Sequence, residues 1–325
     1  MTSPQHAHAS LDGLVMGDAF GDSWFTRSDE NAEEQWAARK PRPRPWLWTD
    51  DSAMAFVLFA HLMTHGEIRP DGLADEFAAE YDRDPGRKYG PSMHGVLRSI
   101  REGGDWRAVT TAQFGGQGSY GNGAAMRVAP LGAWFRGDLP AAREQARLSA
   151  LTTHAHPEAV AGAVAVAVAA ALAAAGEGAD TPPRAEFLRE VAAHVPDSDV
   201  RSGLLVAANF SDRTSVRHAA SVLGSGTLIS APDTVPFALW SAAGHLDDLG
   251  EALWQTVAGW GDRDTTCAIV GGVVAARTGT GGVDAAWHEA REDIPAWSRW
   301  EAPAALPVDV PASLHADAPG LPTAG

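Results

Sequence analysis

Apolar residues at helical spacing recur along most of the chain, whereas the strict alternation expected of half-buried strands is scarce. The most apolar segment, residues 159–175, is long enough to suggest a membrane span, but it is mostly Ala and Val and no Lys or Arg flanks it closely. We expect it to be a central helix buried inside a bundle. The same pattern predicts helices over residues 10–19, 53–60, 71–81, 92–102, 184–194, 200–209, 215–223, 234–243, 246–260 and 267–276.

Pro- and Gly-rich breaks separate these helices. The largest is a charged, proline-rich stretch over residues 22–46, which predicts a loop long enough to cover a neighbouring site. The pattern predicts an all-α protein with a compact single-domain helical bundle over residues 10–300 and sites at helix ends. A flexible Pro- and Ala-rich tail is expected over residues 301–325.

Composition narrows the function classes. The 325 residues are 45% apolar, which is ample for a core, and carry a net charge of −16. That charge argues against a nucleic-acid backbone or an anionic membrane as partner, although not against a small anionic ligand. A single cysteine, Cys267, excludes an internal disulfide and a cysteine-rich zinc site. The N-terminus shows no basic region followed by an apolar one, so we expect a cytoplasmic protein. Separately, we expect a monomer.

Two acidic motifs stand immediately before apolar runs more than two hundred residues apart. The first contains Thr49, Asp50 and Asp51, and the second contains Asp262, Asp264 and Thr265. Carboxylates and hydroxyls suit the first turn of a helix, so capping is one interpretation. Four converging carboxylates would instead suit two hard divalent cations. Spacing alone leaves both interpretations open.

Other motifs are weaker by themselves. The glycine-dense stretch over residues 115–123 would let backbone N–H groups approach a ligand such as a phosphate. It is neither a dinucleotide fingerprint nor a P-loop. His154 stands near the start of the most apolar helix, where histidine is often only a cap. Asp84 precedes a Pro-Gly turn, which it could simply stabilise, and Asp18 alone indicates a structural hydrogen-bonding group.

Taken together, the motifs resemble the ADP-ribosylglycohydrolase family, the group of dinitrogenase-reductase-activating glycohydrolase and the ADP-ribosyl-acceptor hydrolases. The motifs are Gly-Asp-Ala-Phe-Gly (17–21), Trp-Thr-Asp-Asp-Ser (48–52), Gly-Asn-Gly-Ala-Ala-Met-Arg (121–127), Thr-His (153–154) and Gly-Asp-Arg-Asp-Thr (261–265). They occur in the family's order over residues 11–279. The resemblance implies an all-α fold with a binuclear Mg²⁺ or Mn²⁺ cleft.

The resemblance also assigns roles by position. It makes Asp84, in a loop followed two residues on by Gly86, the candidate for positioning or deprotonating water, and Asp51 a second catalytic carboxylate. The implied metal ligands are Thr49, Asp50, Asp51, Asp262, Asp264 and Thr265, and the implied ADP-ribose contacts are Gly121, Asn122, Gly123, Met126 and His154.

The chain departs from the family pattern at two positions. Many members have a glutamate where this chain has Phe25, and the next acid here is Asp29. That change could alter linkage preference or rate. Ser52 replaces a common threonine but keeps the hydroxyl, so its effect should be mild.

The expected reaction is hydrolysis at the anomeric carbon of the distal ribose, through a transition state that resembles an oxocarbenium ion. The leading hypothesis is removal of ADP-ribose from modified arginine on a protein. A second is hydrolysis of a free small-molecule ADP-ribosyl conjugate or another N-glycoside. A third, from another class, is a non-catalytic role, either crystallin-like or in ADP-ribose binding, against which the complete set of acidic ligands argues.

Overall fold

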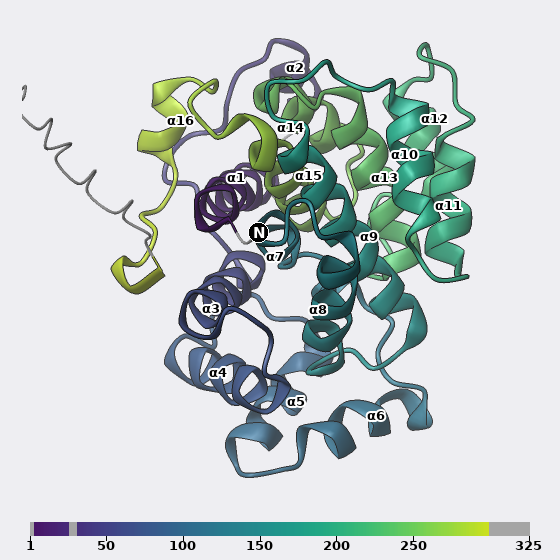
Figure 1. The fold of residues 1–325 in the computed structure, drawn as a ribbon. Coiled ribbons are helices and arrows are strands. Elements are labelled where there is room, and N and C mark those ends of the chain that lie inside the picture. Colours follow the sequence, from purple (N-terminus) through teal and green to yellow (C-terminus); the bar gives the residue numbers. More distant parts are fainter. Residues whose placement is uncertain (1–2, 26–30, 299–325) are drawn as a thin grey trace, which may run out of the picture.

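The computed structural model describes residues 3–25 and 31–298, and within that part the regular structure is helical (Figure 1). The predicted tail over residues 301–325 lies outside the described residues. The helices are α1 (Pro4–Asp22), α2 (Ala32–Ala37), α3 (Asp50–His65), α4 (Pro70–Arg83), α5 (Pro91–Arg101), α6 (Trp106–Gly116), α7 (Ala129–Trp134), α8 (Leu139–Leu151), α9 (Pro157–Ala175), α10 (Arg184–Ala193), α11 (Asp199–Ala207), α12 (Val216–Leu223), α13 (Ala231–Gly244), α14 (Leu249–Val257), α15 (Arg263–Thr278) and α16 (Ala285–Ala290). Two 3₁₀ turns, η1 (Asn122–Ala124) and η2 (Ala296–Ser298), complete the set.

The predicted all-α class is confirmed, and each predicted helix has a counterpart. The structure adds helices where the sequence pattern predicted none, notably α2 inside the expected loop over residues 22–46 and α8. α8 has an ordinary start, since the Asp138 side chain accepts a hydrogen bond from the Ala141 N–H and Pro140 stands in the first turn. α6 is irregular because residues 113–115 leave helical geometry near its end.

The pairing of α1 with α15 holds the fold together, and it is the most extensive helix contact in the described part. A methyl group added at Gly13, Gly17 or Gly21 of α1 would collide with α15 backbone or Cβ atoms only 2.0–2.4 Å away. These glycines are spaced by four residues and therefore form one face of α1. The contacts run from Gly271 through Cys267 to Arg263, so the helices are antiparallel and the end of α1 meets the start of α15.

α9 lies in the middle of the molecule and contacts α7, α8, α13 and α15 (Figure 1). It is apolar and long enough to cross a membrane by composition, but 78% of its most apolar window is buried inside the protein. Its small Ala and Gly side chains let four neighbouring helices approach closely. The prediction of a buried central helix is therefore confirmed. Helices α3 to α6 and α10 to α12 lie on different sides of this centre.

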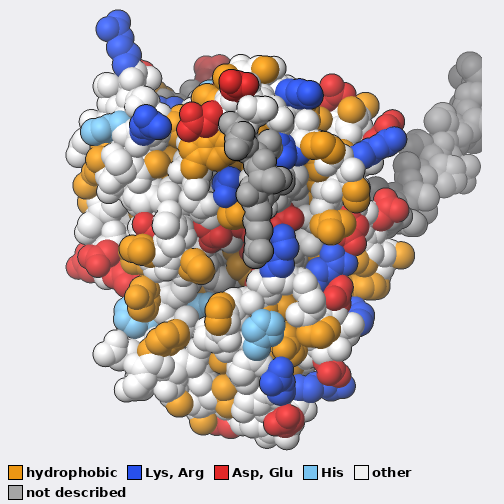
Figure 2. All heavy atoms as spheres, turned by 180° about the vertical axis from the view of Figure 1, so that it is seen from behind, with side chains coloured by type: hydrophobic (Ala, Val, Ile, Leu, Met, Phe, Trp, Pro, Cys, Tyr) orange, Lys and Arg blue, Asp and Glu red, His pale blue; other side chains and the backbone are white. Residues whose placement is uncertain are grey.

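The face turned away from the viewer in Figure 1 is shown in Figure 2. Among its described residues, Lys and Arg side chains are interspersed with Asp, Glu and hydrophobic ones and form no continuous basic stripe. A protein that tracks a nucleic-acid backbone presents such a stripe, so this face lacks that signature.

Candidate active site

Asp18 joins the first acidic motif to α1. Its carboxylate is fully buried and accepts four hydrogen bonds, from the Thr49 N–H and Oγ1 (both 2.9 Å) and from the Ser52 N–H (3.1 Å) and Oγ (2.5 Å). Burial raises the pKa of Asp18 to about 6, although these hydrogen bonds oppose the rise. The predicted structural role of Asp18 is confirmed. It places the start of α3 against the end of α1, beside the start of α15.

Asp50 and Asp51 open α3 but do not cap it. The N-cap is Thr49, whose Oγ1 accepts a hydrogen bond from the Asp51 N–H at 3.3 Å, and Asp18 takes the Ser52 N–H. The two carboxylates are thus free of the capping role that the sequence left open. Asp51 is 2% exposed, and its Oδ1 accepts from Thr265 Oγ1 at 3.4 Å. Its Oδ2 is buried without a hydrogen-bond partner.

The second acidic motif opens α15 and faces the first. Asp262 is the N-cap residue, but its side chain makes no capping hydrogen bond. Instead it accepts a 2.7 Å hydrogen bond from Asn122 Nδ2, which also donates to Thr234 Oγ1. The Thr265 hydroxyl bridges the motifs through its bond to Asp51. The structure therefore brings the two motifs together with Asn122.

These groups line one cavity of about 530 Å³, a size typical of small-molecule sites. Of the predicted site residues, the cavity wall includes Asp50, Asp51, Asp262, Asp264, Thr265, Gly121, Asn122, Gly123, Met126 and His154. Thr49 lies behind the wall, bonded to Asp18. The structure thus brings together most of the residues that the family resemblance implied, and their roles stay predictions.

The carboxylates repel one another strongly. Burial, together with the charges of Asp18 and Asp262, raises the pKa of Asp50 to about 8. Burial also holds the pKa of Asp51 and of Asp264 well above the usual range, again with neighbouring aspartates contributing. Without a counter-cation the wall must keep protons on some of these groups. The partnerless Oδ2 of Asp51 and the set of hard oxygen donors fit a divalent cation.

A buried hydrogen-bond chain stands behind His154 and Gly123 of the cavity wall. Arg127 is fully buried and donates to Gly123 O (3.2 Å), Ser149 O (2.9 Å) and Thr153 Oγ1 (2.9 Å). Because the Thr153 hydroxyl accepts from Arg127, its single proton is available for His154 Nδ1 at 2.8 Å. His154 Nε2 then carries the ring hydrogen, near Gly121 and Gly123.

His154 is a neutral hydrogen-bond donor at this wall. Burial, together with the charge of Arg127, lowers the pKa of His154 to about 3. It is not the cap of α9, because that role belongs to His156, whose Nδ1 accepts the Glu158 N–H. A Cβ on Gly123 would lie 2.8 Å from the His154 ring, so glycine is required for this approach.

Apolar side chains surround the mouth of the cavity. Phe114, Tyr120, Leu228 and Ile229 line it and are 49–75% exposed, unusual for large apolar groups. Phe114 and Ile229 also have positive φ angles, +49° and +52°, which non-glycine residues rarely adopt. The glycine-dense stretch that contains Tyr120 is bonded to the segment that follows Leu228 and Ile229, because the Ala231 N–H donates to Tyr120 O at 3.0 Å. The sequence analysis missed this rim, whose only sequence signal was the glycine density.

Asp84 is not on the cavity wall. It is the C-cap residue of α4, and its Oδ2 accepts from Arg87 Nε at 2.7 Å. Arg87 also pairs with both Glu292 oxygens, donates to Trp48 O and lies over the Trp48 ring. The loop touches the first motif through its backbone, since the Asp50 N–H donates to Arg87 O at 2.7 Å. The role of Asp84 in activating water stays a prediction.

The motif resemblance places Phe25 where many family members carry a glutamate. Its ring lies under the Arg263 guanidinium, 4.1 Å from the ring centroid, and it is not part of the cavity wall. Arg263 also donates to Trp24 O at 2.7 Å. This departure places an aromatic–cation contact at the end of α1. Asp29, the next acid in the chain, lies outside the described residues.

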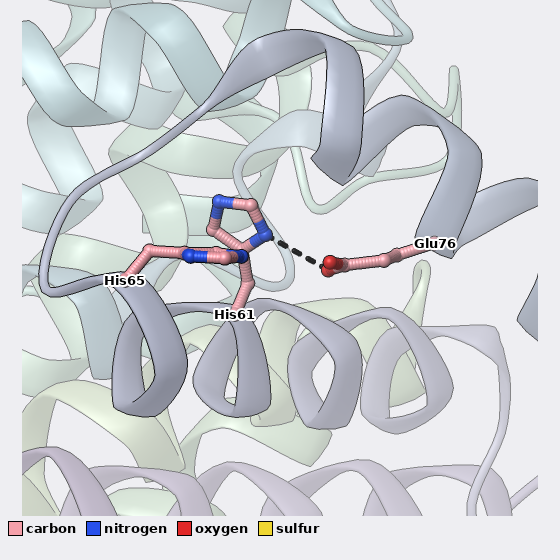
Figure 3. A group of neighbouring side chains, drawn as sticks. All are labelled: His61, His65 and Glu76. Carbon is pink, nitrogen blue, oxygen red and sulfur yellow. Dashed lines mark hydrogen bonds and ion pairs between the residues drawn. The ribbon is translucent and has the colours of Figure 1, made fainter.

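A second group of metal-binding residue types lies away from the cavity. His61 and His65 rise from α3 and Glu76 reaches across from α4 (Figure 3), with ligand atoms all within 4.8 Å of one another. Both His61 nitrogens are already in use. Nδ1 bonds to Glu76 Oε2 at 2.8 Å, and Nε2 accepts the Arg69 N–H at 3.0 Å. This group secures the α3–α4 connection.

Comparison with known proteins decides the family. The family profile described as ADP-ribosylglycohydrolase matches residues 2–311. This chain belongs to the ADP-ribosylglycohydrolase family. It is 30% identical over 281 residues to ADP-ribosylhydrolase ARH3 of Homo sapiens, covering 77% of this chain and 76% of that protein. It is also 30% identical over 167 residues to the ADP-ribosyl-[dinitrogen reductase] glycohydrolase of Rhodospirillum rubrum, covering 48% of this chain and 55% of that protein.

A solved structure described as an ADP-ribosylglycohydrolase-related protein complex shares the fold. The TM-score is 0.61 at 22% sequence identity, and the match covers 89% of this chain and 93% of that one. The resemblance drawn from the motifs is therefore confirmed, and the protein is a glycohydrolase enzyme that removes ADP-ribose.

Proposed function

We propose that this ADP-ribosylglycohydrolase cleaves the N-glycosidic bond between ADP-ribose and an arginine side chain of a modified protein, with two divalent cations, Mg²⁺ or Mn²⁺. The observation that carries the proposal is the convergence of Asp50, Asp51, Asp262 and Asp264 in one cavity. An arginine acceptor carries a cationic guanidinium, which an acidic wall favours. The names of the relatives support a protein-bound substrate, since one is a dinitrogen reductase glycohydrolase.

The residues proposed to hold the cations are Thr49, Asp50, Asp51, Asp262, Asp264 and Thr265. Their oxygens are the hard ligands that Mg²⁺ and Mn²⁺ prefer. When bound, two such ions would lower the pKa of water and help orient the ribose hydroxyls. Thr49 is the least accessible of the set, because its hydroxyl donates to Asp18 and it lies behind the wall.

The remaining wall suits the ADP-ribosyl group. The exposed rings of Phe114 and Tyr120 at the mouth offer flat faces for a base. The N-terminus of α5 opens on the cavity without a side-chain cap, and Gly90 and Ser92 line it there. Such a helix end favours phosphate oxygens. His154 Nε2–H is a neutral donor for a ribose hydroxyl or a phosphate oxygen.

The chain's own groups then act on the reacting ribose. The four carboxylates favour the positive charge that develops at the anomeric carbon. Of the two predicted catalytic carboxylates, Asp51 is the one on the cavity wall. Asn122 fixes Asp262 by its 2.7 Å bond. The buried position of these groups keeps bulk water from screening their charges.

A panel of substrates tests the proposal. Peptides carrying ADP-ribose on arginine, serine and other side chains, together with free ADP-ribosyl conjugates, are incubated with Mg²⁺, with Mn²⁺ and with a chelator. We expect release of ADP-ribose from the arginine peptide, at a rate that the chelator abolishes. Faster cleavage of another linkage would reassign the acceptor, and equal rates in chelator would remove the cations from the proposal.

A further inference from the structure

Lys88 is the one Lys or Arg among the residues that line the described cavity. The chain has only two lysines, Lys88 and Lys40, among its 25 basic residues. The Lys88 ammonium pairs with the carboxylate of Asp22 at the end of α1. The Lys88 side chain is 57% exposed, whereas that of Asp22 is 10% exposed. The long, half-exposed side chain of Lys88 can turn away from Asp22, at the cost of leaving that nearly buried carboxylate without its counter-charge.

The backbone at Lys88 is strained for a side chain. Its φ angle is +65°, in the left-handed region that favours glycine. A non-glycine residue there costs free energy, and such strain persists mainly where a site uses it. The loop that carries Lys88 is fixed at the preceding residue. The Arg87 carbonyl oxygen accepts the Asp50 N–H, and the Arg87 side chain pairs with Glu292. A flexible ammonium thus stands on a rigid base beside the acidic wall.

Besides the divalent cations proposed for the aspartates, an anionic ligand in this acidic cavity is favoured by a positively charged side chain. The cavity wall carries Asp50, Asp51, Asp262 and Asp264, whereas a diphosphate carries two negative charges of its own. His154 supplies no charge, because burial lowers its pKa to about 3. Arg127 supplies none directly, since it is fully buried and its guanidinium faces protein oxygens. Among the described residues this leaves Lys88 as the flexible cation at the wall.

We propose that Lys88 leaves Asp22 and binds the diphosphate of the ADP-ribosyl group, so that it is a substrate-binding residue of this enzyme. The inference rests on the proposed function for the identity of the ligand. Asp22 is then the resting partner that competes with the substrate for the ammonium.

Binding measurements on variants test the proposal. Lys88→Met removes the charge, and Lys88→Gly removes it while relieving the left-handed backbone. Both should weaken ADP-ribose binding about tenfold and leave adenosine binding within about twofold. Lys40→Met, which changes the exposed second lysine, should bind ADP-ribose like the wild type. Lys88→Gly should melt no lower than the wild type, which shows that the loss is not unfolding.

The competitor role of Asp22 gives a change of opposite sign. Asp22→Asn should tighten ADP-ribose binding, and the gain should disappear in the double variant with Lys88→Met, because no ammonium remains to be released. An undiminished gain in the double variant would show that Asp22 acts only through its own charge and would remove it from the proposal.

Chemical labelling tests the contact without any variant. An amine-reactive reagent modifies both lysines of the full chain, and peptide mass spectrometry quantifies each. ADP-ribose should slow modification of Lys88 several-fold, with adenosine protecting it much less and Lys40 unaffected. Wild-type ADP-ribose binding by Lys88→Met and equal protection by adenosine would overturn the proposal.

Two other outcomes separate the sources of error. If the Lys88 variants bind ADP-ribose normally but lose activity only on peptides with acidic neighbours of the modified residue, the ammonium recognises the acceptor and the diphosphate assignment is wrong. If the wild type binds no ADP-ribose at all, the proposed function fails, and the Lys88 assignment fails with it.

Discussion

The aspartate cavity and the group formed by His61, His65 and Glu76 both gather side chains that can ligate a metal. In the histidine group, both His61 nitrogens have protein partners and the three ligand atoms lie within 4.8 Å. In the cavity the carboxylates are spread around a wall, and Asp51 Oδ2 is buried with no partner. The difference teaches that unmet hydrogen-bonding capacity, rather than proximity alone, marks a group built for a ligand.

The two regions also differ in electrostatics. Burial and mutual repulsion raise the pKa values of Asp50, Asp51 and Asp264, so the cavity stores unfavourable charge that a cation would relieve. The histidine group pairs an imidazole with a carboxylate that is 41% exposed and stores no such repulsion. Changes in the cavity should therefore affect chemistry and ion response, while changes in the histidine group should affect only local structure.

The largest expected effect comes from the first acidic motif. Asp51→Asn should lower turnover by a factor of about 100 or more, because it removes a carboxylate that faces the reacting ribose. His65→Ala, at the other end of the same helix, should leave turnover within about twofold. Steady-state kinetics on both variants checks this. A comparable loss in His65→Ala would mean that the histidine group belongs to the active site.

A smaller effect on stability should separate the two regions in the same way. Asp18→Asn replaces an acceptor of four hydrogen bonds by a group that can accept fewer and would present N–H to donors. We expect a loss of about 2 kcal/mol in the free energy of unfolding. Glu76→Gln keeps an acceptor for His61 at a half-exposed site and should cost less than about 1 kcal/mol. Urea denaturation measures the free energy of unfolding of both variants. Equal losses would show that Asp18 is not needed to hold the start of α3 against α1.

The response to pH and cations is the next in size. The pKa of Asp50 is raised from 3.8 to about 8, so between these values the folded chain holds a proton that the unfolded chain has released. Stability of the ion-free protein should thus fall as pH rises toward 8. His154, with its pKa lowered from 6.5 to about 3, has the opposite effect only below pH 6.5. The window from pH 6.5 to 8 therefore isolates the carboxylates.

Between pH 6.5 and 8, millimolar Mg²⁺ or Mn²⁺ should raise the melting temperature by a few degrees. The ions should also remove the decrease in melting temperature that the ion-free protein shows as pH rises. Asp264→Asn should weaken the response, whereas Glu76→Gln should leave it unchanged. Thermal melts with and without chelator measure it. A response that survives Asp264→Asn and is lost in Glu76→Gln would assign the ion to the histidine group.

The smallest expected effect concerns Asp84. A residue that activates water would lose about 100-fold in turnover as Asn, with its melting temperature preserved. Its place at the end of α4, paired with Arg87 and off the cavity wall, favours the other outcome, a slightly lower melting temperature with turnover nearly intact. Kinetics and melting on one preparation distinguish the two. A 100-fold loss would show that the loop moves Asp84 into the site.

Periodicity and local motifs predicted much of this molecule. The helical class and the buried central helix were readable, because helix formation and burial depend on residues a few positions apart. That the two acidic motifs share a site with Asn122 and His154 was implied only by the resemblance to the family. The motif order was enough to identify the family. Where the pattern was weak, as at α2 and α8, helices were missed because tertiary packing stabilises short segments that periodicity does not single out.

Only the tertiary structure decided what each carboxylate does within its surroundings. Asp18, Asp51 and Asp84 are the same residue type near helix ends, yet one accepts four hydrogen bonds, one keeps a partnerless oxygen on the cavity wall and one pairs with an arginine outside it. The partners of Asp18 and Asp51 lie at the starts of other helices, which the glycine face between α1 and α15 helps to bring together, whereas Arg87 is only three residues from Asp84. Sequence determines which groups exist, while burial and long-range neighbours set their charge and reach, because both depend on distances through space.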